Sequence, residues 1–167
     1  MIEFRINGEY DDYLEEVDYT ARTFFNIDND STQIMADKKT YNYSCRIGGS
    51  TIMALENGKL LGWCFAFPTN RKLMEQFLND TISERELFWM TKKNKKYDAV
   101  YLCAAYVYSN HRQMGLGTKL INECLKPLLK ERVCIFYEPY TKKGKRLGES
   151  ALKDYKYEIK VKQHEST

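Results

Sequence analysis

Hydrophobic and polar residues alternate along this chain with two different periods. Between residues 10 and 25, apolar side chains recur at intervals of three and four, which predicts an amphipathic helix. Residues 99–107 are continuously apolar, as expected of a central strand that is buried on both faces. Asn57-Gly58 separates two further strand-like runs. Asn-Gly at such a point is a strong hairpin signal, because both residues tolerate a positive φ.

The same patterns predict strands and helices along the whole chain. The predicted strands cover residues 2–6, 51–55, 59–67, 99–107, 133–137 and 155–161. The predicted helices cover residues 10–25, a weaker stretch from Ser31 that carries Ile34 and Met35, the segments 73–78 and from 81 onward, and residues 116–129 and 142–153. Ser31 is expected to cap the second helix. Thr81 and Glu84 are expected to form a capping box, and Pro127 to kink or shorten its helix.

Length and composition indicate one compact domain. With 167 residues, 43% of them hydrophobic and 14% aromatic, the chain can bury a full core without disulfides or a structural metal. We expect this domain to cover residues 1–162 and a short tail to cover residues 163–167. No apolar run approaches the roughly 20 residues that cross a bilayer, and the N-terminus lacks a signal-peptide pattern. The protein is therefore expected to be cytoplasmic, with no membrane partner.

Cysteine and histidine are too few and too scattered for several kinds of site. The five cysteines form no Cys-x-x-Cys pair, and we expect them to be reduced core residues. Only His111 and His164 could supply imidazole, which argues against a His-based zinc site and against a Ser-His or Cys-His hydrolase. No metal site is predicted.

The net charge of +3 is unevenly distributed. Residues 1–40 contain ten Asp and Glu against four Lys and Arg, whereas residues 126–162 contain eleven Lys and Arg against five Asp and Glu. Solvated helix faces would account for both regions. The functional interpretation is that a phosphate-rich ligand binds near the basic C-terminal part.

The segment 107–118 joins the predicted central strand to a long helix and carries the clearest chemical signal. Its sequence, Val-Tyr-Ser-Asn-His-Arg-Gln-Met-Gly-Leu-Gly-Thr, places a polar turn and two glycines directly before a helix. The first turn of a helix offers unpaired N–H groups and the positive end of its dipole, and glycines let phosphates approach the backbone. Arg112 adds a positive charge and Thr118 a hydroxyl donor. A diphosphate suits this arrangement.

This turn resembles the acyl-CoA signature of the GCN5-related N-acetyltransferases, which is Gln or Arg, two residues, Gly, any residue, then Gly or Ala. Arg112, Gly115 and Gly117 occupy the three defining positions. The predicted order of elements is also similar to that family over nearly the whole chain. The resemblance implies an α/β (α+β) fold with a mixed, mostly antiparallel central sheet flanked by helices, whose strands 4 and 5 splay around acyl-CoA. Alternatively, the glycines make only a tight turn or cradle a nucleotide, although both the P-loop ending and the Rossmann fingerprint are missing.

The resemblance further implies an acetyl-CoA-dependent N-acetyltransferase, in which a primary amine of a small molecule or peptide attacks the thioester directly. A free backbone N–H on the fourth strand would stabilise the negative charge that develops on the thioester oxygen. The residues implied to bind acetyl-CoA are Tyr106 and Val107 along the pantetheine arm, and Arg112, Gln113, Met114, Gly115, Leu116, Gly117 and Thr118 around the diphosphate.

The sequence departs from the family where a Tyr usually protonates the departing thiolate. That Tyr precedes, by about five residues, an aromatic that opens the last strand. If this aromatic is Tyr155, Ser150 takes the place of the acid; if it is Tyr157, Leu152 does. The usual acid is therefore missing from its expected position.

Glu138-Pro139-Tyr140 replaces the Asn that is common after the fifth strand in this family. We expect Tyr140 to be the candidate acid for the thiolate, and Glu138 to be the candidate base for the substrate ammonium. The missing Tyr and Asn keep a second hypothesis open, namely a non-catalytic acyl-CoA-binding module with the same fold.

No motif defines the acceptor amine. Acidic residues of the first helix could attract a polyamine, an aminoglycoside or a lysine side chain, or could merely face solvent; they are Asp11, Asp12, Glu15, Glu16 and Asp18. The long connection over residues 70–96 could form a wall of the acceptor pocket or a homodimer contact. Nucleic-acid binding is disfavoured, because the basic C-terminal part carries no recognition motif.

Overall fold

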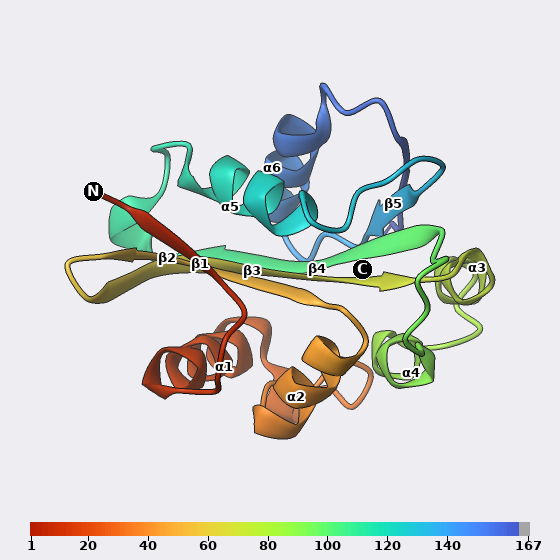
Figure 1. Cartoon of the computed structure of the whole chain (residues 1–167), viewed down its shortest axis with the longest axis horizontal. Helices are drawn as coiled ribbons and strands as arrows, with labels where there is room; N and C mark the ends of the chain where they lie inside the picture. The colour runs from red at the N-terminus through yellow and green to blue at the C-terminus, as the bar shows by residue number, and fades with distance from the viewer. Residues whose placement is uncertain (164–167) are drawn as a thin grey trace.

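Six strands form one mixed sheet in the spatial order β1-β2-β3-β4-β5-β6 (Figure 1). The computed structural model describes residues 1–163, so residues 164–167 of the predicted tail lie outside the described residues. The strands are β1 (Glu3–Ile6), β2 (Ser50–Glu56), β3 (Lys59–Thr69), β4 (Ala99–Val107), β5 (Cys134–Tyr137) and β6 (Glu158–Val161). Neighbours are antiparallel from β1 to β4 and parallel from β4 to β6, which confirms the mixed sheet expected from the sequence.

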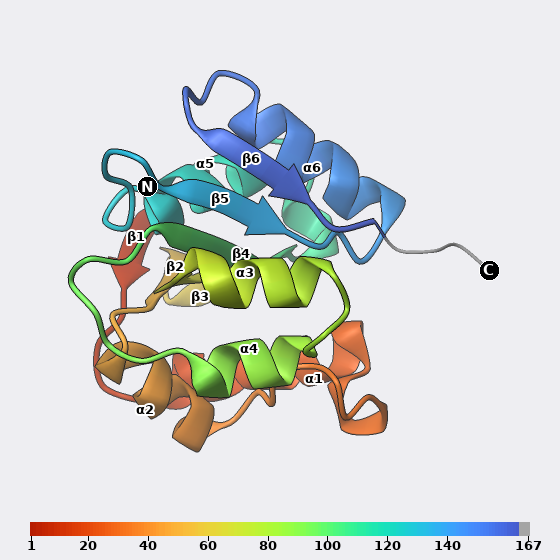
Figure 2. The ribbon, with the colours of Figure 1, turned by 90° about the vertical axis from the view of Figure 1, so that its right-hand side faces the viewer.

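Helices cover both faces of this sheet. They are α1 (Asp12–Phe25), α2 (Lys38–Arg46), α3 (Arg71–Leu78), α4 (Glu84–Met90), α5 (Leu116–Leu125) and α6 (Lys142–Leu152). In Figure 1, α5 and α6 lie above the sheet, whereas α1, α2 and α4 lie below it. Figure 2 shows α3 and α4 side by side at one end. No helix within residues 1–163 combines the length and the apolar character that a membrane crossing requires.

Apolar clusters fill the space between the sheet and each helical layer. One cluster packs α5 and the end of α6 onto the upper face, through residues such as Leu120, Ile121 and Leu152. Two clusters lie on the opposite face, one under α3 and α4 around Tyr101, and one under α1 around Trp63. The sheet is therefore buried on both sides, as the long apolar run in β4 predicts.

Strand β4 carries the irregularity that divides the sheet. It pairs with β3 along its whole length, but its pairing with β5 covers only Ala99 to Tyr101. The register with β3 skips Cys103, which forms a β-bulge just beyond the last pair shared with β5. From the bulge to Val107, β4 and β5 are not paired and diverge. The fourth and fifth strands are thus splayed, as expected.

The second helix begins later than the sequence predicted. Ser31 caps no helix; instead, the Asp37 side chain caps α2 by accepting a hydrogen bond from the Thr40 N–H. The chain before α2 is irregular because its backbone bonds elsewhere. The Ile34 N–H, for example, donates to the Glu84 carboxylate at 3.2 Å.

The capping box of α4 also lies elsewhere than predicted. Ser83, not Thr81, accepts a hydrogen bond from the N–H of Glu86, and the Glu86 side chain accepts one from the Ser83 N–H. When the helix begins after Ser83, Leu87 faces the core and is buried. It also releases Glu84 from a capping role, so that its carboxylate bonds across the fold.

Two further boundaries show how local chemistry sets the ends of elements. Helix α5 ends at Leu125, two residues before Pro127, which confirms the expected early end. Strand β6 begins at Glu158 and not at Tyr155, because the Tyr155 hydroxyl donates to Asn122 of α5 at 2.6 Å and holds that residue against the helix.

We predict that Ser83→Ala destabilises the protein by about 1 kcal/mol, because it leaves a first-turn N–H of α4 without its side-chain acceptor. Thr81→Ala is the matched control at an exposed position and should change the free energy of unfolding by less than about 0.5 kcal/mol. Urea denaturation followed by circular dichroism measures both values. A larger effect for Thr81→Ala than for Ser83→Ala would contradict the assigned cap.

Candidate active site

A cavity of about 1490 Å³ occupies the gap between the diverging ends of β4 and β5 and continues below the sheet. One end lies at the start of α5, beside Gly115 and Thr118. The other end lies among α1, the start of α4 and the loop after β5, beside Phe25, Glu84 and Tyr140. A single continuous space thus connects the glycine turn recognised in the sequence with side chains from the N-terminal half of the chain.

The turn before α5 presents the end of that helix to the cavity. Gln113 and Gly115 adopt positive φ values of 65° and 78°, and the helix begins directly afterwards. The Lys119 N–H donates to the Gly115 carbonyl at 3.2 Å, so the N–H groups of the preceding residues belong to the open first turn. The positive φ explains the glycine at position 115, because most side chains disfavour this conformation.

Arg112 is bound to the strand that leads into the turn. Its Nε atom donates to the Val107 carbonyl at 2.7 Å, and its guanidinium lies 5.6 Å from the centre of the Tyr106 ring. These contacts hold a permanent positive charge at the mouth of the turn.

Gly117 has a second role that the motif alone does not reveal. A Cβ atom at this position would lie 3.0 Å from Cδ1 of Leu147, so α6 packs closely against the start of α5. The close packing brings Lys143 and Arg146 of α6 onto the cavity wall. The basic C-terminal segment therefore contributes positive charge beside the turn.

Most of the predicted acetyl-CoA residues line this cavity, and two do not. Those on its wall are Tyr106, Val107, Arg112, Gln113, Gly115, Gly117 and Thr118. The Met114 side chain is exposed, and the Leu116 side chain is buried in the core above the sheet. Met114 and Leu116 can therefore contact a ligand in the cavity only through their backbone atoms.

The free edge of β4 faces the cavity with alternate backbone groups. The Tyr108 N–H donates to Leu61 of β3 at 3.0 Å, so Tyr106 and Ala104 also turn their backbone groups toward β3. Ala105 and Val107 must then turn theirs toward the gap, and the contact between Arg112 and the Val107 carbonyl agrees with this. The gap is therefore bordered by a row of backbone donors and acceptors.

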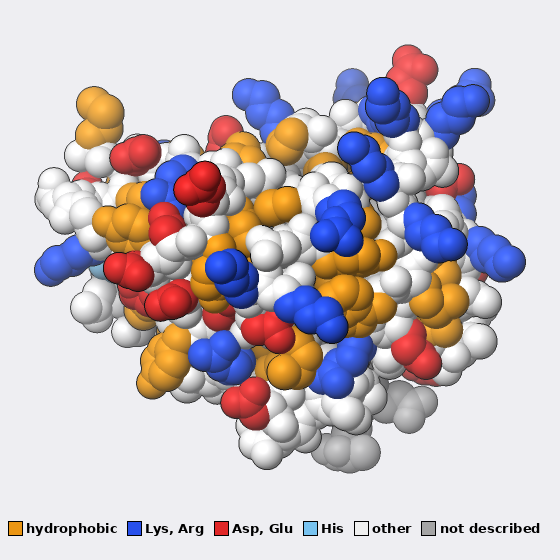
Figure 3. Space-filling model, turned by 60° about the horizontal axis from the view of Figure 1, so that its bottom comes forward, with side chains coloured by type: hydrophobic (Ala, Val, Ile, Leu, Met, Phe, Trp, Pro, Cys, Tyr) orange, Lys and Arg blue, Asp and Glu red, His pale blue; other side chains and the backbone are white. Residues whose placement is uncertain are grey.

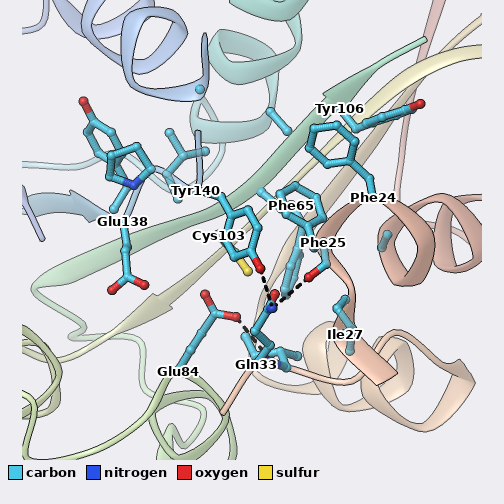
Figure 4. A pocket seen from close by; sticks show the side chains of 18 of the residues that line it. Phe24, Phe25, Ile27, Gln33, Phe65, Glu84, Cys103, Tyr106, Glu138 and Tyr140 are labelled. Carbon is cyan, nitrogen blue, oxygen red and sulfur yellow. Dashed lines mark hydrogen bonds between the residues drawn. The ribbon is translucent and has the colours of Figure 1, made fainter. Parts of the chain in front are cut away.

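Aromatic rings form the wall of the cavity below the sheet (Figure 4). The Phe24 ring lies 5.1 Å from that of Tyr106, and the Phe25 ring lies 5.5 Å from that of Tyr140. Phe65 of β3 lines the same part of the cavity. Helix α1 and the loop after β5 therefore meet across the space through the edge-on rings of Phe25 and Tyr140.

The two predicted catalytic residues both reach this end of the cavity. Glu138 lies 3.5 Å from the Lys162 ammonium, and its side chain is one-fifth exposed. The Tyr140 hydroxyl accepts a long hydrogen bond of 3.5 Å from the Gln33 side chain. Of the two positions considered for the family's Tyr acid, Ser150 lines the cavity, whereas Leu152 is buried in the core.

Glu84 also lines the cavity, although no motif in the sequence marks it as a functional residue. Its carboxylate accepts hydrogen bonds from the Tyr101 hydroxyl at 2.6 Å and from the Ile34 N–H at 3.2 Å. Burial raises the pKa of Glu84 to about 7, and the nearby Glu138 carboxylate adds to the increase. The only signal in the sequence was Tyr101 itself, because a Tyr in a buried strand requires a partner for its hydroxyl.

Only one of the five acidic residues singled out in the first helix lines the cavity. This residue is Asp18, which accepts a hydrogen bond from the Tyr10 hydroxyl. Burial raises the pKa of Asp18 to about 6. Asp11 pairs with Arg5 at 2.6 Å and caps α1. Most of the negative charge on α1 therefore stabilises the fold or faces solvent, and does not face the cavity.

No group of three or more His, Cys, Asp or Glu side chains within residues 1–163 is arranged to hold a metal ion. The connection over residues 70–96 contributes α3 and α4, and residues 80–84 at its centre line the cavity.

These features define an acyltransferase fold, and the chain belongs to the GNAT acetyltransferases. The family model described as "Acetyltransferase (GNAT) family" matches residues 14–139. No curated protein matches the chain. The family assignment therefore rests on the family model and on the fold.

Solved acetyltransferase structures share this fold at low sequence identity. Ribosomal-protein-alanine N-acetyltransferase from Brucella melitensis biovar Abortus 2308 is 11% identical, with a TM-score of 0.54 and 90% of each chain covered. Arabidopsis thaliana Naa50, in complex with the bisubstrate analogue CoA-Ac-MVNAL, is 16% identical, with a TM-score of 0.51 and coverage of 92% of this chain and 80% of that one. Arylalkylamine N-acetyltransferase 2 from Aedes aegypti is 15% identical, with a TM-score of 0.50 and coverage of 88% and 81%. At such identities the likeness shows the fold alone.

The raised pKa of Glu84 predicts a pH-dependent difference in stability between the wild type and Glu84→Gln. A carboxyl whose pKa is about 7 in the folded state and about 4.5 when unfolded binds more protons when folded, so the wild type loses stability as the pH rises between these values. Glu84→Gln lacks this titration. Relative to the wild type, it should gain roughly 2 to 3 kcal/mol between pH 5 and pH 8.

Urea denaturation of both proteins at the two pH values measures this difference. Any constant effect of the amide on the Tyr101 hydrogen bond cancels, because only the change with pH is compared. The other acidic groups that face Glu84, Glu138 and Asp30, are present in both proteins. An equal pH dependence for the two proteins would show that Glu84 has an ordinary pKa.

Proposed function

We propose that this protein is an acetyl-CoA-dependent N-acetyltransferase that transfers an acetyl group to a primary amine of a small molecule or peptide. The observation that carries the proposal is the continuity of the cavity. It runs from the first turn of α5, past the unpaired edge of β4, to carboxylates on the other side of the sheet. Such a space suits a long ligand that binds at one end and reacts at the other.

The chemistry of the upper part of the cavity fits acetyl-CoA. The open first turn of α5, with Gly115 before it, would bind the diphosphate through backbone N–H groups. Arg112, Thr118 and the basic side chains of α6 supply positive charge and a hydroxyl beside it. The backbone groups of Ala105 and the Val107 N–H, directed into the gap, would bind the amides of the pantetheine arm, in the way that an added strand pairs with a sheet edge.

Acetyl-CoA supplies an acetyl thioester, which a neutral amine attacks directly. The Ala105 N–H, directed into the gap, would stabilise the negative charge that develops on the thioester oxygen. Burial raises the pKa of the Cys103 thiol, so this neighbour is held as a thiol and is a poor nucleophile. Glu138 would accept a proton from the substrate ammonium, and Tyr140 would protonate the departing sulfur.

The relatives of known structure support amine acetylation in general terms. By their names, the Brucella protein acts on a ribosomal-protein alanine and the Aedes protein on arylalkylamines, and the Arabidopsis protein was solved with a CoA-peptide conjugate. We propose that this chain likewise acts on an amine. Its cytoplasmic location and a homodimer through residues 70–96 remain predictions.

A non-catalytic acyl-CoA-binding module is the alternative function. The observation that favours it is the pair of residues at the place of the usual Tyr acid. Ser150 has no acidic hydroxyl, and Leu152 lies in the core. In this alternative, the part of the cavity beside α5 binds acyl-CoA, and the part below the sheet carries out no reaction.

We predict that the wild type binds acetyl-CoA and that Thr118→Trp weakens binding by at least about 30-fold, because the indole would fill the cavity at the start of α5. Lys119→Trp is the matched control, since it adds the same ring to the next residue, which is exposed and outside the cavity. Its affinity should stay within about threefold of the wild type. Calorimetric titration measures these affinities. Equal binding by both variants would refute the proposed diphosphate site.

Thr118 is preferable to Gly117 for this test. Any side chain at Gly117 would push against Leu147, so a bulky substitution there would disturb the packing of α6 as well as the binding site.

We predict that the wild type releases free thiol from acetyl-CoA when primary amines are added. Thiol detection across a panel of small amines and short peptides measures this activity. Binding of acetyl-CoA without thiol release for any member of the panel would favour the non-catalytic alternative.

A further inference from the structure

Glu84 is a carboxylate at the wall of the cavity that has no cationic partner in the described part of the chain. Its two hydrogen-bond donors, the Tyr101 hydroxyl and the Ile34 N–H, are both neutral. None of the ion pairs within residues 1–163 includes Glu84. A partly buried carboxylate without a compensating cation is costly for a folded protein, so its presence at a cavity requires an explanation.

Two cations on neighbouring segments, Lys162 and Arg85, bond to groups other than Glu84. Lys162 lies 2.7 Å from Asp80 and 3.5 Å from Glu138. Arg85, the next residue in the helix, donates to the Gln33 carbonyl at 2.7 Å. Neither of these cations forms an ion pair with Glu84.

Three other carboxylates on the cavity wall lie near a cation, whereas no cation is among the groups that shift the pKa of Glu84. Glu138 is paired with Lys162. Asp30 accepts hydrogen bonds from the Thr32 and Gln33 side chains. Asp18 is bonded to Tyr10 and lies near Arg22, which lowers its pKa. Glu84 is the member of this group that would gain most from a cationic ligand.

Aromatic side chains form a large part of the wall around Glu84, beside polar side chains such as Gln33. Figure 4 shows Phe24, Phe25 and Phe65 across the space from Glu84 and Glu138, with Tyr140 between the two sides. Phe24 is 42% exposed even though it is a large apolar residue in a well-packed fold. Exposed aromatic surface across the cavity from a carboxylate without an ion pair is the complement of a molecule with an apolar body and one positive charge.

We propose that Glu84 binds the ammonium group of the acceptor and takes its proton, and that the acceptor is a monoamine on an aromatic or branched apolar stem. This inference rests on the proposed N-acetyltransferase function. It moves the role of base from Glu138 to Glu84, because Glu138 lies 3.5 Å from the Lys162 ammonium, whereas Glu84 belongs to no ion pair within residues 1–163.

The proton balance of the step is complete. A substrate ammonium transfers one proton to the Glu84 carboxylate and becomes a neutral amine. When the amine nitrogen bonds to the acetyl carbon and the carbon–sulfur bond breaks, the nitrogen loses a second proton and the sulfur gains one. Glu84 returns its proton to water after the products leave. A base whose pKa lies near neutral pH suits both halves of this cycle.

The same observations argue against polycationic acceptors. A polyamine or an aminoglycoside would bring several charges to a region where the Glu138, Asp18 and Asp30 carboxylates already lie near cationic side chains. The acidic residues of α1 do not change this conclusion, because Asp18 alone among them lines the cavity.

The experiment compares thiol release by the wild type with 2-phenylethylamine, spermidine, kanamycin and a tetrapeptide with a free N-terminus. We expect kcat/KM for 2-phenylethylamine to exceed those for spermidine and kanamycin by at least about tenfold, and that for the peptide by a smaller factor. Glu84→Gln should lower kcat/KM for 2-phenylethylamine by at least about a hundredfold. Its affinity for acetyl-CoA in calorimetric titration should stay unchanged.

Glu75→Gln is the matched control, because it removes the same charge from an exposed position on α3, where Glu75 pairs with Lys160. Its kcat/KM should stay within about threefold of the wild type. Circular dichroism establishes that each variant is folded. The amine panel on the wild type tests the acceptor class even if Glu84→Gln does not fold.

The possible outcomes separate this inference from the proposed function. Thiol release that prefers spermidine, kanamycin or the peptide, or that survives Glu84→Gln within about threefold, would overturn the inference and leave the N-acetyltransferase function intact. Binding of acetyl-CoA with no release for any amine would overturn both. Preference for 2-phenylethylamine, together with the loss in Glu84→Gln, supports both.

Discussion

The early end of the pairing between β4 and β5 is the constraint on which the rest of this structure depends. A sheet is stabilised when its strands stay paired, yet these two strands separate after Tyr101 while β4 continues to Val107. Side chains along a strand alternate between the two faces of the sheet, and the extra residue at the Cys103 bulge shifts this alternation by one. The side chains of Tyr101 and Tyr106, on either side of the bulge, therefore both point to the lower face. Backbone groups that would otherwise bond to β5 border the cavity instead, where a ligand or water must satisfy them.

Each end of the gap is completed by a different part of the chain. Above the sheet, α6 packs so closely on α5 that Gly117 touches Leu147, and this contact brings basic side chains to the helix terminus. Below the sheet, α1, the irregular segment before α2 and the start of α4 form a wall that is held together by aromatic rings and by Glu84. The burial of this carboxylate lowers stability at neutral pH, and the apolar clusters on both faces of the sheet offset the loss.

The charge asymmetry of the chain divides into one part that faces the cavity and one that does not. Lys143 and Arg146 of the basic C-terminal region lie on the cavity wall. The acidic N-terminal region is largely used by the fold itself, as in the pair Arg5–Asp11 and the bond from Tyr108 to Glu16. Figure 3 shows the lower face of the molecule, where apolar side chains are exposed between acidic and basic ones. Net charge alone does not distinguish these roles, because it ignores which charges already have partners.

The sequence by itself determined the order of elements, the hairpin at Asn57-Gly58, the early end of α5 and the glycine turn, because each depends on residues within a few positions of one another. The tertiary structure alone decided that Ser83 caps α4 and that Glu84 reaches into the cavity to meet Tyr101. It also decided which of the predicted acetyl-CoA residues line the cavity with their side chains. Contacts such as that between Glu84 and Tyr101 join residues far apart in the chain, so no local pattern predicts them. Thr81 and Ser83 are equally good local caps, and the burial of apolar side chains in the tertiary structure decides between them.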